Sequence, residues 1–318
     1  IVRHCLEKSP GERFQSARDL AFDLEALSSD STVSTSATSA RLAAAGRGLR
    51  PRRALLAALA VAVAVAAIAA AFVLGRRSVT AVLPSFQRRT FRNGQVWTAD
   101  FAPDGRTIVY GASWDGEPVR VYSTRPESPE SSPLAFSEAT VFSVSRSGEM
   151  ALLLGPAFLR GFTFAGTLAR APLSGGAPRE VLEGVQWADW GPDGESLAVV
   201  RDVEGRNRLE FPIGKMLHET TGWLSHPRVA PRGDHVAFLL HPIRGDDGGS
   251  VVAVDLAGKA SVLSADWVSA QGLAWSPDGD EIWFTATRQG MARALHAVSL
   301  GGRERLVALV AGPLILDA

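Results

Sequence analysis

Residues 83–318 of this 318-residue chain are predicted to form a mainly β fold, a ring of four-stranded units. Three observations predict it. A glycine-centred turn occurs five times, its glycines lie 43, 46, 39 and 46 residues apart, and each copy leads into a β-branched and apolar stretch. A period of roughly 43 residues with four strands is that of a β-propeller blade. The sequence therefore predicts a propeller with five complete blades.

Each copy joins an apolar strand end to a second strand through a tight turn. The first copy begins Phe101-Ala-Pro-Asp-Gly105 and the fifth begins Trp275-Ser-Pro-Asp-Gly279. Proline presets φ, aspartate can bond its own backbone, and glycine takes the left-handed conformation. Copies two and four lose part of this pattern, with Arg146-Ser147 and Arg232, but keep the glycine. The predicted structural residues are therefore the five turn glycines, Gly105, Gly148, Gly194, Gly233 and Gly279.

Further turn signals complete the repeat. The stretches Asp255-Leu-Ala-Gly258-Lys and Ser299-Leu-Gly-Gly302-Arg predict turns between outer strands. The stretch from Gly312 to Asp317 resembles the approach to a sixth turn, so we expect a parent protein of six or more blades and a chain that is a fragment. All eight tryptophans follow residue 83, and we expect packing between blades to explain Trp187, Trp190, Trp275 and Trp283.

This turn, Ser-Pro-Asp-Gly in its best-preserved copy, resembles the TolB-like, WD-related propeller repeat. The resemblance covers about 220 residues. It implies a propeller that binds a protein or a small ligand, commonly at the mouth of its central channel.

A second region, residues 54–75, predicts a transmembrane helix. These 22 residues carry no charge, and as a helix they would span roughly 33 Å, close to the hydrocarbon core of a bilayer. Residues 31–82 contain seven arginines and no acidic residue, as membrane-flanking segments do. Residues 83–318 carry 22 basic against 27 acidic side chains, and the whole chain is neutral, so no charge pattern points to nucleic acid.

Residues 29–53 are predicted to be a disordered juxtamembrane linker. Nine of the twelve residues from Ser28 to Ser39 are serine or threonine, and no apolar period supplies a core. Basic side chains follow at Arg47, Arg50, Arg52 and Arg53. A flexible spacer and a phosphorylated segment are both open interpretations, because phosphates here would add charge beside the basic patch.

Residues 1–28 predict the end of a helical domain. Ser16 suits an N-cap, and apolar residues at Ala17, Leu20, Ala21, Leu24 and Leu27 form one helical stripe. The stretch from Cys5 to Phe14 with this helix resembles the C-terminal end of a bacterial serine/threonine kinase domain. In that family the arginine matching Arg13 is structural and pairs with the glutamate of an Ala-Pro-Glu motif. The phosphate-transferring motifs of the family do not occur here, so ATP and Mg²⁺ are expected only for a kinase domain outside these residues.

No catalytic, cofactor or metal motif stands out in the propeller region. His218, His226, His235 and His241 lie close in sequence, but isolated roles are expected because they fall on different strands or loops. The loop from Arg244 to Gly249 is acidic and glycine-rich; a solvated hairpin tip is favoured over a cation site. Gly155-Pro156 and Gly175-Gly176 are expected to be turns. The sequence therefore assigns no catalytic, cofactor-binding or metal-binding residue.

Together these features predict the propeller sensor of a membrane-anchored bacterial serine/threonine kinase. The resemblance to kinases places the N-terminus in the cytoplasm and the propeller outside a single-pass plasma or inner membrane. Expected partners are the membrane, an envelope protein or small ligand at the propeller, and a second copy of the chain in a signalling dimer. A membrane-anchored transcription regulator or a non-catalytic scaffold with the same propeller is the alternative.

Overall fold

The computed structural model describes residues 90, 92–128, 130–290 and 292–309. The predictions for residues 1–82 and for a sixth turn after Gly312 lie outside these residues. Over the described ranges the chain forms nineteen strands in four hydrogen-bonded sheets and contains no helix, so no candidate for a membrane-crossing helix occurs there. The mainly β prediction is confirmed for this part of the chain.

The nineteen strands make five blades. Blade 1 contains β1 (Gly94–Phe101), β2 (Ile108–Trp114), β3 (Arg120–Thr124) and β4 (Ser132–Ser137). Blade 2 contains β5 (Ala139–Val144), β6 (Glu149–Arg160), β7 (Thr163–Pro172) and the first half of β8 (Arg179–Trp190), and blade 3 the second half of β8, β9 (Leu197–Val203), β10 (Arg206–Glu210) and β11 (Met216–Thr220). Blade 4 contains β12 (Trp223–Val229), β13 (His235–His241), β14 (Gly249–Asp255) and β15 (Ala260–Trp267), and blade 5 β16 (Ser269–Trp275), β17 (Glu281–Thr287), β18 (Ala294–Ser299) and β19 (Glu304–Ala308).

Strand β8 belongs to two blades. Residues between Arg179 and Leu182 pair with β7 as the outermost strand of blade 2, whereas Trp187–Trp190 pair with β9 as the innermost strand of blade 3. Gly184, with φ of +70°, lies between these two halves. Blades 2 and 3 are therefore one continuous seven-stranded sheet, while the other three blades are separate four-stranded sheets.

The five repeated turns connect the innermost strand of each blade to the second strand. Their glycines all have positive φ, between +63° and +80°, and each glycine N–H donates to the carbonyl three residues earlier at 2.8–3.0 Å. In the first copy Asp104 also accepts from the backbone N–H groups of Arg106 and Thr107 and from the Thr107 hydroxyl. These bonds, the Thr107 hydroxyl above all, lower the pKa of Asp104 to about 2.

The second copy shows how the turn survives without its Pro-Asp pair. There Ser145 Oγ accepts the N–H of Glu149 at 3.0 Å. Ser147 Oγ lies 2.9 Å from Ser145 Oγ. The remaining signals at Gly258 and Gly302 lie, as predicted, between the two outer strands of blades 4 and 5, with φ of +87° and +79°.

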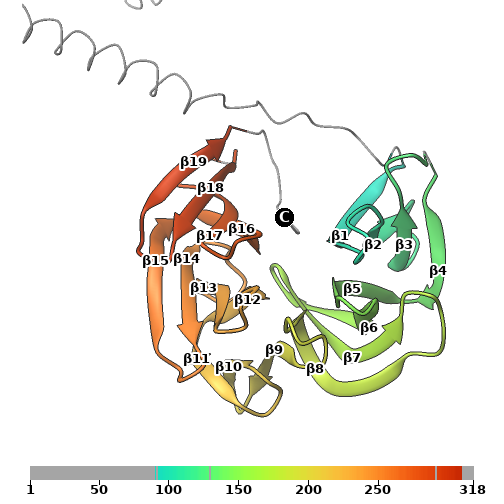
Figure 1. The fold of residues 1–318 in the computed structure, drawn as a ribbon, viewed down its shortest axis with the longest axis horizontal. Helices are drawn as coiled ribbons and strands as arrows, with labels where there is room; N and C mark the ends of the chain where they lie inside the picture. The colour runs from blue at the N-terminus through green and yellow to red at the C-terminus, as the bar shows by residue number, and fades with distance from the viewer. Residues whose placement is uncertain (1–89, 91, 129, 291, 310–318) are drawn as a thin grey trace, which may run out of the picture. The chain divides into compact units, whose positions relative to one another are not determined.

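The core lies between blades, because each blade is too thin to bury its own apolar faces. Four clusters each combine side chains from two adjacent blades. Trp190 belongs to the cluster of blades 2 and 3, and Trp275 to that of blades 4 and 5. Burying such a side chain contributes roughly 1.5–3 kcal/mol each. In Figure 1 the blades follow one another around a centre, and an open sector separates blade 1 from blade 5.

Candidate binding site in the central channel

Two pockets lie on the axis of the ring, one at each end of the innermost strands β1, β5, β8, β12 and β16. The pocket at the beginning of these strands, which we call the aromatic pocket, has a volume of about 350 Å³. All five blades line it, and the side chains on it include Trp97, Phe142, Phe164, Trp187, Trp223 and His226. No lysine, arginine, aspartate or glutamate is among its lining residues.

A β-bulge in every innermost strand builds this pocket. The pairing of each such strand with the second strand skips at least one residue, and the skipped residues include Trp97, Phe142, Gln186, His226 and Gly272. A bulge adds a residue that has no partner across the ladder, so its side chain can leave the normal alternation. Four of the five residues line the aromatic pocket.

His226 is the most constrained of them. Its φ is +51°, in the left-handed region that few residues with a side chain adopt. The Nδ1 atom of His226 lies 2.9 Å from Ser225 Oγ, which lies 2.8 Å from Nε2 of His241. The Nδ1 atom of His241 lies 3.1 Å from the carbonyl oxygen of Gly248. Burial lowers the pKa of His241 to about 4, and burial with the nearby Arg228 lowers the pKa of His226 well below its ordinary value, so both rings are neutral at pH 7.

Aromatic rings form the wall around this histidine. The ring of Trp187 lies 4.2 Å from that of His226 and 5.7 Å from that of Phe142. On the blade 1 side, Trp97 and Phe164 lie 4.4 Å apart. Such offset and tilted pairs are the geometry in which further planar groups stack favourably.

A long hairpin, β6–β7, reaches over the aromatic pocket. Its tip lies near the centre of the ring in Figure 1, and Gly161 and Phe162 line the pocket. The tip meets the β13–β14 loop so closely that a Cβ on Gly161 would overlap the backbone of Gly245. Three large apolar side chains on the hairpin, Phe158, Leu159 and Phe162, are 46–62% exposed. The hairpin therefore links blade 2 to blade 4 and shows an apolar surface beside the pocket.

The hairpin corrects one sequence-based prediction. Gly155 and Pro156 lie inside β6, not in a turn. Gly155 has φ of +56°, and the pairing with β7 is shifted between Leu154 and Ala157, which marks a bulge. Proline is tolerated at this point because a bulge leaves a residue without a ladder hydrogen bond. Gly175 and Gly176 do lie between strands, after the end of β7.

The pocket at the other end of the innermost strands, which we call the turn-end pocket, differs in charge. It has a volume of about 320 Å³ and is lined by Asp100, Asp189, Arg146 and Arg228. Asp100 accepts the N–H of Val144 at 2.5 Å, and Asp189 accepts that of Val229 at 2.7 Å. The two aspartates are thus engaged in joining neighbouring blades.

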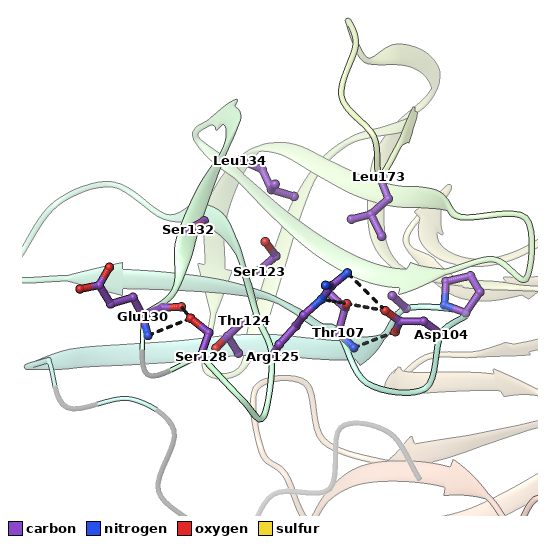
Figure 2. A pocket seen from close by; sticks show the side chains of 12 residues that line it. Asp104, Thr107, Ser123, Thr124, Arg125, Ser128, Glu130, Ser132, Leu134 and Leu173 are labelled. Carbon is purple, nitrogen blue, oxygen red and sulfur yellow. Dashed lines mark hydrogen bonds and ion pairs between the residues drawn. The ribbon is translucent and has the colours of Figure 1, made fainter.

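A third pocket, of about 570 Å³, lies at the outer part of blade 1 and is shown in Figure 2. It is bounded by the repeated turn with Asp104 and by Ser128, Glu130, Ser132 and Leu134. Asp104 there bonds the backbone and hydroxyl of Thr107, and Arg125 donates to the Thr107 hydroxyl at 3.0 Å. Asp104, Thr107 and Arg125 thus stabilise the turn, and we do not assign a ligand to this pocket.

The histidines predicted to have isolated roles do not all stay apart. His226 and His241 meet through Ser225, whereas His218 packs on Phe238 and His235 opens β13. The isolated interpretation was wrong for this pair because β12 and β13 are neighbours in one sheet, which sequence spacing does not reveal. Among the described residues no group of three His, Cys, Asp or Glu side chains could hold a metal ion.

The loop from Arg244 to Gly249 is not a solvated tip. Asp247 accepts hydrogen bonds from Ser269, Gln271 and Arg293 of blade 5 at 2.7–3.0 Å. On the blade 3 side, Arg244 donates to the carbonyl oxygens of Thr221 and Gly205. Arg244 and Asp247 were predicted to face water, but they satisfy polar groups at the junctions between blades, whereas Asp246 is exposed.

Comparison with known proteins agrees with this architecture. No family model and no curated protein matches the sequence. Two solved structures are similar: TolB from Acinetobacter baumannii, at 18% identity over 66% of this chain and 53% of that chain with a TM-score of 0.54, and a putative TolB from Agrobacterium tumefaciens, at 14% identity over 73% and 87% with a TM-score of 0.58. The fold is a TolB-like β-propeller. At these identities the likeness shows the fold alone, and the chain spans about half the length of the first of these proteins.

Proposed function

We propose that the propeller is the extracytoplasmic binding domain of a membrane-anchored bacterial serine/threonine kinase, and that its ligand or partner occupies the aromatic pocket. The observation that supports a binding role is the bulge in each innermost strand. Bulges interrupt the ladder in all five blades at the level of one pocket, and four of the bulged side chains line it. Strained backbone such as that of His226 is concentrated at functional sites.

Support for the membrane and kinase parts of the proposal comes from the sequence. Residues 54–75 have the length and composition of a transmembrane helix, and residues 1–28 resemble the end of a kinase domain. The alanine-rich helix allows close approach of a second copy, so ligand binding outside would change kinase proximity inside.

The binding role is tested on the full chain, purified from bacterial membranes in nanodiscs after crosslinking. Trp187→Ala removes a wall of the aromatic pocket, and Trp283→Ala, on β17 and outside the pocket, is the matched control. We expect mass spectrometry to find a molecule crosslinked to the wild type and to Trp283→Ala but not to Trp187→Ala. The same crosslinked molecules in all three samples would contradict a role for this pocket.

The topology and the kinase assignment need separate tests. Protease added outside spheroplasts should digest the propeller and spare a tag placed before Ile1; digestion of that tag would reverse the topology. A coding sequence upstream of Ile1 that contains His-Arg-Asp and Asp-Phe-Gly motifs would support the kinase, whereas a winged helix there would overturn it.

A further inference from the structure

We propose that the aromatic pocket recognises an uncharged aromatic or heteroaromatic group that donates one N–H or O–H hydrogen bond to Nε2 of His226. The inference rests on the proposed function, since it takes the pocket to be the binding site, and it adds the chemical class of the ligand. It is carried by the hydrogen-bond chain behind His226, the absence of charge on the pocket lining and the rings around it.

The series of hydrogen bonds starts at His241 and determines which atom carries each hydrogen. The Nδ1 atom of His241 faces the carbonyl oxygen of Gly248, which can only accept, so Nδ1 carries the proton. In a neutral imidazole the other nitrogen is then an acceptor. Ser225 lies 2.8 Å from that nitrogen and must therefore donate its hydroxyl hydrogen to His241.

The hydroxyl of Ser225 then has no hydrogen left for His226. At 2.9 Å, Nδ1 of His226 must be the donor and Ser225 Oγ the acceptor. With Nδ1 protonated, Nε2 of the neutral His226 ring carries a lone pair. The described residues provide no hydrogen-bond donor to Nε2, and His226 lines the aromatic pocket. The pocket thus contains an acceptor whose tautomer the protein has fixed in advance.

The backbone holds this acceptor in place. His226 lies at the bulge of β12, where the pairing with β13 skips from Ser225 to Arg228, and its φ of +51° is one that side-chain-bearing residues seldom adopt. The Trp187 ring at 4.2 Å restricts rotation of the imidazole. A pre-oriented acceptor gains affinity because binding does not have to order it.

The lining excludes charged ligands. Most of the other polar lining groups have partners: Gln186 bonds Asn207 and Asp202, Gln271 donates to Asp247, and the hydroxyls of Thr98 and Thr140 lie 2.6 Å apart, while Gln95 is uncharged and exposed. An ion in this pocket would lose its hydration without a counter-charge on the lining. A flat neutral group with one hydrogen-bond donor suits this surface.

The test uses the full chain in nanodiscs, with equilibrium dialysis of indole and of 1-methylindole, and empty nanodiscs of the same lipid as reference. Indole has a donor N–H and 1-methylindole does not, although their rings are alike. We expect indole to bind the wild type with a dissociation constant below roughly 1 mM and about ten-fold more tightly than 1-methylindole. His226→Phe keeps a ring and removes the acceptor, so it should bring the ratio close to one. His218→Phe, a histidine outside the pocket, should leave the ratio unchanged.

Two results would overturn the proposal. Equal binding of the two indoles to the wild type would show that no acceptor is used, and this comparison needs no variant to fold. Tighter binding of 1-naphthalenesulfonate than of indole would show that the pocket prefers an anion. Neither result touches the crosslinking comparison of Trp187→Ala with Trp283→Ala, so a wrong ligand class and a wrong binding site can be distinguished.

Discussion

The two ends of the channel are built from the same five strands but use polar groups in opposite ways. At the aromatic pocket the lining is uncharged, and Nε2 of His226 has no hydrogen-bond partner among the described residues. At the turn-end pocket Asp100 and Asp189 are bonded to the backbone of the next blade. The comparison teaches that in β1 and β8 one end of the strand joins neighbouring blades while the other end lines the aromatic pocket.

The contacts at the turn-end pocket depend on which residue occupies one position of the repeat. The residue five places before each turn glycine is, in order, Asp100, Ser143, Asp189, Arg228 and Ala274. The two aspartates accept a backbone N–H from the following blade. In blade 2 this position is Ser143, whose Oγ is buried without a hydrogen-bond partner among the described residues. Blade 2 does not need such a contact with blade 3, because the two blades share strand β8 in one continuous sheet. The aspartate contact therefore occurs at two junctions that no continuous strand connects, blade 1 to blade 2 and blade 3 to blade 4.

The largest expected loss of stability comes from removing the contact of Asp189 with the next blade at the turn-end pocket. Asp189 is 8% exposed, accepts the N–H of Val229 at 2.7 Å and lies 3.6 Å from the Arg228 guanidinium. Asp189→Ala removes an acceptor and a counter-charge from a buried setting, which costs about 4 kcal/mol. Urea denaturation of the full chain followed by tryptophan fluorescence measures this, since all eight tryptophans lie in the propeller region.

The control for that variant is Asp189→Asn. An amide oxygen still accepts the N–H of Val229 but carries no charge, so the loss should be smaller than that of Asp189→Ala. Equal losses would mean that the charge, not the backbone bond, carries the interaction. A loss below about 1 kcal/mol for Asp189→Ala would contradict the claim that this end joins the blades.

The histidines of blade 4 beside the aromatic pocket should make the fold less stable as the pH falls, the same direction as for a carboxylate whose pKa is lowered by folding. Burial lowers the pKa of His241 to about 4, against about 6.5 in an unfolded chain. Between these values the unfolded state binds more protons, so stability is complete above about pH 6.5 and falls as the pH drops toward 4, by about 3 kcal/mol. The lowered pKa values of His218, His226 and His296 act with the same sign.

Denaturation midpoints between pH 7 and pH 4 measure this dependence. His241→Gln keeps an acceptor for Ser225 and a donor for Gly248 but does not titrate, so it should flatten part of the curve. A curve for His241→Gln as steep as that of the wild type would show that His241 is not the residue responsible.

The two ends also differ in how far the sequence could predict them. The turn end has a sequence signature, because Pro, Asp and Gly each have a local role, and Gly105 to Gly279 mark the blades without any tertiary information. The bulges have none. Trp97, Phe142 and His226 share no residue type, and what makes them a site is a skipped partner on the neighbouring strand. The pairing of His226 with His241 likewise depends on strand register, which no spacing in the sequence gives.

The smallest predicted effect is a difference in stability between alanine substitutions in two of the repeated turns, at Gly105 and at Gly233. Gly105 and Gly233 have φ of +63° and +73°, so alanine is strained at both and costs about 1 kcal/mol. The space around them differs. A Cβ at Gly105 would meet nothing within 4 Å, whereas at Gly233 it would lie 3.0 Å from Cγ of Pro192 on the turn of blade 3. Gly233→Ala should therefore lower the free energy of unfolding more than Gly105→Ala, by a few tenths of a kcal/mol up to about 1 kcal/mol. Asparagine tolerates this backbone better than alanine, so Gly105→Asn should recover part of the loss. If Gly105→Ala proved the more damaging of the two, contact between turns of adjacent blades would not help to join them.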